Sequence, residues 1–343
     1  MKKILTLLFF LMIFSAAAIA WYGYSEYQAS LEVPLALPAS GMTYEVASGT
    51  NLKAVAQDLE AKGILPRAIF LELYARETGD AARIKAGEYH LEPGLDLKSL
   101  MALLVRGKTV QYRFSIIEGT RYQDALKVIA SQPDVEQSID PENFIATFQE
   151  LTGEAHPEGW LFPDTYHHLK NIKDTELILN AYQMTKSTLE ELWPQREADL
   201  PLATPYEALI LASIVEKETA VADERPKIAG VFINRLRKGM KLQTDPTVIY
   251  GMGDAYDGNI RKADLRRDTP WNTYTRKGLP PTPISTAGRE AIAAVLNPES
   301  TSALYFVASG GGRHAFTDTY AEHRKAVIKY QLGGNSSRYQ GDK

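Results

Sequence analysis

Residues 44–59, YEVASGTNLKAVAQDL, combine the marks of a short strand, a glycine turn and an amphipathic helix. Val46 lies three residues before Gly49, and apolar side chains then recur three, six, seven and ten residues beyond this glycine. This spacing predicts a strand that ends at the glycine, followed by a helix with one apolar stripe. The pattern is repeated around Gly94 and Gly119. Strand–turn–helix units of this kind predict an α+β fold.

The N-terminal segment predicts a transmembrane helix. Lysines at 2 and 3 precede the uncharged, apolar run 4–25, which is long enough to span a bilayer. Aromatic residues at 21, 22 and 24 suit the membrane interface, and the lysines predict a cytoplasmic N-terminus with the rest of the chain outside. The alternative is a cleaved signal peptide, because Ala-Ile-Ala at 18–20 fits a cleavage site. We expect the anchor to be retained.

The chain is expected to contain several segments of different character. From about Phe114 onward, motifs dense in Trp, Tyr, Asn, Pro and Gly alternate with amphipathic helices. The predicted segments are a cytoplasmic tip and anchor at 1–25, a spacer at 26–41, a small α+β subdomain at 42–112, a larger mixed α+β domain at 113–335, whose motifs are described below, and a tail at 336–343.

Composition excludes several classes of function. The net charge is -4 and the basic residues are spread along the chain, which argues against a nucleic-acid partner. With no cysteine, thiol catalysis and cysteine-ligated metals are excluded. The six histidines show no metal-binding spacing, and neither a phosphate loop nor a dinucleotide fingerprint is present. We therefore expect no metal and no cofactor.

The segment 204–220, TPYEALILASIVEKETA, predicts a helix that carries two acids. Thr204 suits the N-cap, Pro205 the first helical position and Glu207 a capping box. Near the end, Glu216 and Glu218 interrupt the apolar run.

These two glutamates are predicted to point to nearly opposite sides of the helix. Glu218 shares the apolar stripe, whereas Glu216 falls on a more mixed face. Desolvation on an apolar face raises the pKa of a carboxyl group, and a glutamic acid protonated near neutral pH suits glycoside cleavage. The alternative is that Glu218 is a structural residue paired with Arg225 or Arg235.

Several collinear motifs resemble the YceG-like (MltG) family of endolytic murein transglycosylases. The resemblance runs from the anchor to about Tyr330, and Thr282 departs from it, since the family more often has Gly after Pro-Pro. The motifs are ASIVEKETA at 212–220, EGWLFPDTY at 158–166, VFINRL at 231–236, LQTDPTVIY at 242–250, NTY at 272–274 and GLPP at 278–281.

The resemblance implies a catalytic role for Glu218, because the second glutamate of the Glu-Lys-Glu segment is the catalytic one in that family. It also implies cleavage between N-acetylmuramic acid and N-acetylglucosamine within nascent peptidoglycan strands, leaving 1,6-anhydro ends and terminating strand elongation. The implied location is the inner membrane with a periplasmic catalytic domain, and the implied partners are glycan strands and peptidoglycan synthases. Residues 44–52 resemble the opening of a LysM module, a small glycan-binding βααβ fold; a scaffold without a ligand is the alternative.

Other motif residues are candidates for binding the glycan. For the aromatic residues the alternative is core packing, and for the two aspartates it is a turn or capping role, although either is also a candidate second acid. The candidates are Gln243, Thr244, Asp245, Asn272, Tyr274, Trp160, Asp164 and Tyr166.

Two other functions remain open. One is a glycoside hydrolase that uses Glu218 with Asp245 or Asp164. The other is a non-catalytic peptidoglycan-binding scaffold.

Overall fold

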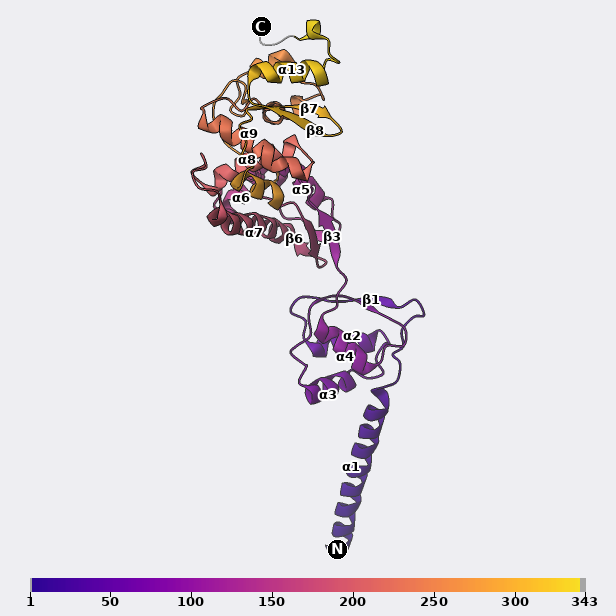
Figure 1. Cartoon of the computed structure of the whole chain (residues 1–343). Helices are drawn as coiled ribbons and strands as arrows, with labels where there is room; N and C mark the ends of the chain where they lie inside the picture. Colours follow the sequence, from indigo (N-terminus) through magenta and orange to yellow (C-terminus); the bar gives the residue numbers. More distant parts are fainter. Residues whose placement is uncertain (1, 340–343) are drawn as a thin grey trace. The chain divides into compact units, whose positions relative to one another are not determined.

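The computed structural model describes residues 2–339, which form two compact units, each described here by itself (Figure 1). One unit runs to Tyr112 and includes His168–Lys170; the other comprises Arg113–His167 and the chain from Asn171 onward. Residues 340–343 of the expected tail lie outside the described residues. Both units combine helices with short two-stranded sheets, so the predicted mixed α+β class is confirmed.

In the first unit, strands β1 and β2 pair in antiparallel register, with Tyr44 opposite Tyr89. The predicted turn glycines Gly49 and Gly94 adopt φ of 80° and 86°, a conformation that favours glycine. The predicted apolar stripe of α2 is buried. The elements are α1 (Lys2–Ser30), β1 (Met42–Val46), α2 (Leu52–Ala61), α3 (Ala68–Thr78), β2 (Gly87–Leu91) and α4 (Leu97–Arg106).

Helix α1 extends beyond the predicted end of the anchor. Residues Thr6–Ser30 are long and apolar enough to cross a membrane. Tyr27, however, is buried against Phe70, with ring centroids 5.9 Å apart, and its hydroxyl donates a 2.7 Å hydrogen bond to Glu77. The predicted spacer 26–41 was therefore wrong: it begins as helix and supplies buried side chains to the core of the first unit.

In its described residues, the second unit holds three small sheets: β3 pairs with β5, β4 pairs with β6 in parallel, and β7 pairs with β8 in antiparallel register. Its strands are β3 (Tyr112–Ser115), β4 (Val135–Glu136), β5 (Thr165–His168), β6 (Ile172–Lys173), β7 (Tyr305–Gly310) and β8 (Arg313–Thr317). Its α-helices are α5 (Tyr122–Ala130), α6 (Phe144–Thr152), α7 (Asp174–Leu192), α8 (Pro205–Glu218), α9 (Arg225–Arg237), α10 (Asp245–Met252), α11 (Lys262–Arg266), α12 (Arg289–Leu296) and α13 (Tyr320–Tyr330). Short 3-10 turns are η1 (Pro141–Asn143), η2 (Trp193–Gln195), η3 (Ala222–Glu224), η4 (Gly253–Ala255) and η5 (Ser336–Arg338).

Helix α8 is the centre of the second unit. Thr204 caps it by accepting a 3.2 Å hydrogen bond from the Glu207 backbone N–H, while the Glu207 carboxylate reaches Ala203 N–H rather than the cap residue. Residues 208–215 are buried, and the helix packs against α9 and α12. Because the buried helix ends at Glu218, this side chain emerges from the core at a fixed position.

The β7–β8 hairpin lies near the C-terminal end of α8. In Figure 1 it lies beside α13, and Phe306 packs edge-on against Phe232 of α9 with centroids 5.7 Å apart. Strand β7 starts at Tyr305, and helix α9 starts at Arg225.

Candidate active site

Glu218 is the last residue of α8 and lines a cavity of about 500 Å³. The side chain is partly exposed, and its Oε1 accepts a short hydrogen bond from the Thr244 hydroxyl. The cavity lies between the end of α8, the start of α10, β7 and α13. Its polar and aromatic lining includes Glu218, Arg235, Gln243, Asp245, Tyr274 and Tyr305.

The loop before α10 holds Thr244 against Glu218. Thr244 is buried, and its N–H donates a 3.1 Å hydrogen bond to the Thr273 hydroxyl. Gln243 N–H donates to the Thr273 carbonyl at 3.2 Å, and Gln243 has a φ of 50°, which few non-glycine residues adopt. Thr273 of the 272–274 motif thus holds the loop 243–245 beside Glu218 through its hydroxyl and its backbone carbonyl.

The pKa of the Glu218 carboxyl is raised to about 7, chiefly by burial. The negative charge of Asp245 raises it further, whereas the hydrogen bond from Thr244 and the charge on His314 lower it. Asp245 in turn accepts a 2.6 Å hydrogen bond from the Tyr274 hydroxyl. Glu218 is therefore suited to hold a proton at neutral pH and to exchange it, as a general acid–base group does.

Glu216 differs from the prediction of a mixed helix face. Its side chain is only 3% exposed and forms a 3.1 Å ion pair with Arg225, which also reaches Glu118 at 3.5 Å. The other Glu216 oxygen accepts a 3.0 Å hydrogen bond from Gly288 N–H. Burial alone does not distinguish the roles of the two glutamates. Both carboxylate oxygens of Glu216 contact structural partners, whereas Glu218 faces a cavity.

Arg235, the other predicted partner of Glu218, instead braces the loop before Thr244. Its guanidinium donates to the carbonyls of Leu304, at 2.6 Å, and Leu242, at 2.9 Å, and to the Gln243 side chain at 3.3 Å. The alternative that Glu218 is a structural residue paired with Arg225 or Arg235 is therefore not supported.

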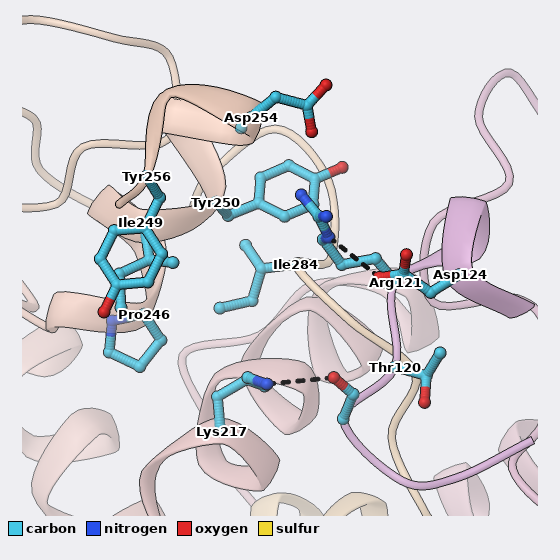
Figure 2. A pocket seen from close by; sticks show the side chains of 12 residues that line it. Thr120, Arg121, Asp124, Lys217, Pro246, Ile249, Tyr250, Asp254, Tyr256 and Ile284 are labelled. Carbon is cyan, nitrogen blue, oxygen red and sulfur yellow. Dashed lines mark hydrogen bonds and ion pairs between the residues drawn. The ribbon is translucent and has the colours of Figure 1, made fainter. Parts of the chain in front are cut away.

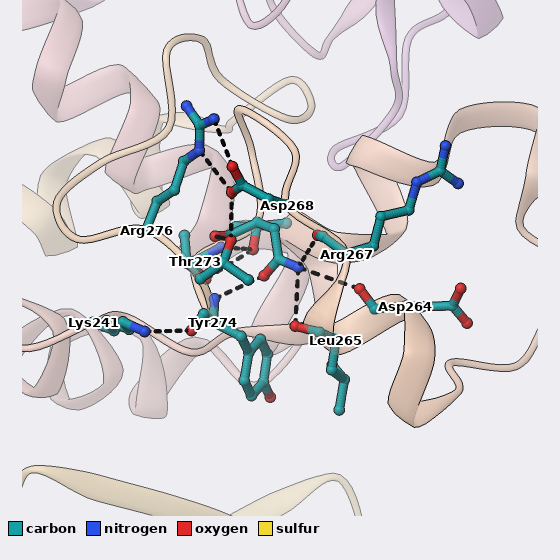
Figure 3. Close-up of polar contacts among 11 residues, drawn as sticks. Lys241, Asp264, Leu265, Arg267, Asp268, Thr273, Tyr274 and Arg276 are labelled. Carbon is teal, nitrogen blue, oxygen red and sulfur yellow. Dashed lines mark hydrogen bonds and ion pairs between the residues drawn. The ribbon is translucent and has the colours of Figure 1, made fainter.

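Asn272 was wrongly predicted to contact substrate. It is 0% exposed, and its amide N–H groups donate to three backbone carbonyls while its oxygen accepts from Tyr274 N–H at 2.8 Å. Figure 3 labels the partner residues Asp264, Leu265, Arg267 and Tyr274. All of its polar atoms thus serve the 264–274 loop, which positions Tyr274. The three acceptors are Asp264 at 3.2 Å, Leu265 at 3.1 Å and Arg267 at 2.8 Å.

Trp160 and Tyr166 are core residues, as the alternative interpretation held. Trp160 is buried and stacks on Tyr206 with centroids 5.8 Å apart. Tyr166 is buried and stacks on Phe114 at 5.3 Å. Asp164 directly precedes β5, and its carboxylate accepts a 2.6 Å hydrogen bond from the adjacent Thr165 N–H; it does not line the Glu218 cavity.

Several site residues were not predicted. His314 influences Glu218 and is oriented by Glu224, whose carboxylate contacts the ring Nδ1 at 2.8 Å and accepts from His314 N–H at 3.1 Å. Tyr305 and His323 line the cavity from β7 and α13. No local spacing connects residues this far apart with Glu218, so the motifs contained no signal for them. Within residues 2–339, no group of three or more His, Asp or Glu is placed to hold a metal.

Comparisons with known proteins place this geometry in context. The sequence matches the YceG-like family over residues 44–329. An endolytic murein transglycosylase of Bacillus subtilis is 35% identical, over 83% of each chain. One of Streptococcus pneumoniae strain R6 is 29% identical over 95% of this chain, which spans only 65% of that relative's length. The crystal structure of a YceG-like protein from Listeria monocytogenes superposes with a TM-score of 0.51 at 30% identity, covering 84% of this chain and 99% of that one.

Proposed function

The chain belongs to the YceG-like family, and from this membership we propose that it is an endolytic murein transglycosylase, a lyase that cuts the glycan strands of peptidoglycan. The family resemblance predicted from the motifs is thereby confirmed. The observation that carries the proposed mechanism is Glu218, a carboxyl group on a cavity wall with a pKa of about 7.

In the proposed reaction, Glu218 serves first as acid and then as base. Its proton passes to the glycosidic oxygen between N-acetylmuramic acid and N-acetylglucosamine as the bond from that oxygen to C1 breaks. The C6 hydroxyl of the muramyl sugar then closes onto C1 and returns its proton to Glu218. The product is a 1,6-anhydro end, and no water is consumed. Because the nucleophile is internal, no second carboxylate is needed to activate water.

Analysis of the sugar ends in digested sacculi tests this proposal. Purified protein should cut strands at internal bonds and leave a 1,6-anhydro-muramyl end at each cut. Free reducing ends would identify a hydrolase, and binding without new ends would identify a scaffold. The hydrolase is the second candidate because Asp245 lines the same cavity and is close enough to raise the pKa of Glu218.

The rate of cleavage is expected to fall as the pH rises through about 7, because the acid step needs protonated Glu218 and its pKa is about 7. Asp245→Asn removes the like charge that raises this pKa, so the alkaline limb should move to lower pH. A pH profile of kcat/KM measures the shift. Asp164→Asn, the matched control outside the cavity, should leave the limb in place; an unmoved limb in Asp245→Asn would contradict the assignment.

We also propose that residues 42–112 form a LysM-like glycan-binding subdomain. The strand–helix–helix–strand order from β1 to β2 supports this. A chain that starts at Arg113 should bind sacculi more weakly than the chain from residue 26, measured by co-sedimentation with folding checked by circular dichroism. Equal binding would make this region a scaffold.

For location, we propose an anchor retained in the inner membrane, with the N-terminus cytoplasmic and the catalytic domain in the periplasm, supported by the helix Thr6–Ser30. Intact mass of the membrane fraction should include residues 4–25; a mature chain beginning at Trp21 would contradict retention. Peptidoglycan synthases are the proposed partners. Crosslinking in membranes should recover a synthase together with this protein, and recovery of none would contradict the proposed partnership.

A further inference from the structure

A second cavity, of about 620 Å³, is drawn in Figure 2. Like the Glu218 cavity, it is lined by residues at the end of α8 and the start of α10. Lys217 and Pro246 line it, whereas their neighbours Glu218 and Asp245 line the first cavity. Successive residues of a helix point about 100° apart, so the end of α8 and the start of α10 present one face to each cavity. Glu218, which lines the first cavity, therefore directly follows a residue that lines the second.

The walls of this second cavity combine aromatic and apolar surface with a few polar groups. Figure 2 shows Tyr250 and Tyr256 around the open space, with Ile249 and Pro246 beside Tyr256. Asp254 lies at its rim. Mixed linings of this kind are typical of sites for small organic ligands.

The cationic groups of the cavity already have partners. Lys217 Nζ donates a 3.1 Å hydrogen bond to the Gly119 carbonyl, and Arg121 lies 3.4 Å from the Asp124 carboxylate. These groups are held in place by their partners, and fixed polar groups beside aromatic rings suit a ligand with many hydroxyl and amide groups, such as an N-acetylated sugar.

The aromatic wall is also held in place. Tyr250 contacts Trp271 edge-on, with ring centroids 5.4 Å apart, and the Trp271 N–H donates a 2.9 Å hydrogen bond to the Thr282 hydroxyl. Thr282, the departure from the family pattern, thus has a structural role here. A preorganised wall reduces the entropy that a ligand loses on binding.

We propose that this second cavity binds sugar residues of the same glycan strand, beyond the bond placed at Glu218. This inference rests on the proposed function. A strand bound in both cavities crosses the α8–α10 boundary and presents an internal bond to Glu218. Cleavage within strands, rather than at their ends, then follows from the two cavities.

Full-length protein in detergent, carrying Glu218→Gln to prevent turnover, allows binding to be measured directly. The probes are glycan strands with and without their stem peptides. Tyr256→Ala should weaken binding of both probes about tenfold, the loss expected when an aromatic contact in a binding site is truncated. Ile249→Trp, which fills the cavity, should have a similar effect. Tyr330→Ala is the matched control, since Tyr330 is exposed and lines neither cavity.

In the active protein, the two cavity variants should raise KM and shift the products from long strands to short fragments cut from the ends. The inference is overturned if both variants bind and cut like Tyr330→Ala while melting normally. It is also overturned if only strands that carry stem peptides lose affinity, because the cavity would then bind peptide. Failure of the wild type to make anhydro ends would refute the proposed function and leave the binding comparison valid.

Discussion

Glu218→Gln should lower the rate of glycan cleavage by at least about two orders of magnitude, the contribution usual for a general acid–base group. The amide can still accept the hydrogen bond from the Thr244 hydroxyl but cannot transfer the catalytic proton. Release of 1,6-anhydro ends from sacculi, followed at several protein concentrations, measures the loss. Activity within a few-fold of the wild type would show that Glu218 is not the general acid–base group.

The same variant should not lose stability. The pKa of Glu218 is raised in the folded state, so the folded protein holds more protons than the unfolded chain between about pH 4.5 and 7. The wild-type free energy of unfolding therefore falls as the pH rises through this window, whereas the amide does not titrate. We expect the melting temperature of Glu218→Gln to equal or exceed that of the wild type at pH 8. A clear decrease would mean that the carboxylate supports the fold.

Glu216→Gln should have the opposite profile, with a large loss of stability. Burial raises the pKa of the Glu216 carboxyl as well, but Glu216, unlike Glu218, is the close ion-pair partner of a buried cation. Removing its charge leaves the Arg225 guanidinium only the longer ion pair with Glu118. Breaking a buried ion pair typically costs about 3–5 kcal/mol. For a unit of this size that corresponds to a melting temperature lower by roughly 6–20 °C. Below the melting transition the variant should keep appreciable activity, because Glu216 does not face the cavity.

Glu191→Gln is the matched control for this effect. Glu191 pairs with Arg289 at 2.5 Å, but both side chains are about half exposed. Exposed pairs contribute at most about 1 kcal/mol, so this control should melt close to the wild type. Thermal melting of both variants at one pH gives the comparison. Equal melting temperatures would show that the buried Glu216–Arg225 ion pair contributes no more to stability than the exposed Glu191–Arg289 pair.

The local elements follow from short-range rules and were predictable. Val46 and Gly49 predict the turn into α2, and Thr204 and Pro205 predict the start of α8. A left-handed glycine, a capped first turn and an apolar stripe each depend on residues fewer than about ten positions apart. The motif at 242–250 likewise identified the loop that contacts Glu218, because its residues are adjacent in the chain.

Roles that depend on distant partners were predicted less well. Asn272 and Trp160 are residue types that often bind sugars. In this structure the Asn272 amide donates to backbone carbonyls, and Trp160 stacks on Tyr206 in the core. Sequence shows the chemistry of a side chain but not which surface it meets. The choice between substrate contact and packing is made by burial, which is set by the whole fold.

By itself, the sequence determined the α+β class, the apolar N-terminal helix, the family and the acid that we propose for catalysis. Those features are encoded in composition, local spacing and collinear motifs. Tertiary structure alone decided that Arg225 pairs with Glu216 rather than Glu218, and that Glu224 orients His314 from 90 positions away. It also decided that the end of α8 and the start of α10 each contribute residues to two cavities. Ion pairs and cavities arise where separate segments pack together, and their partners are fixed by distance in space rather than by separation along the chain.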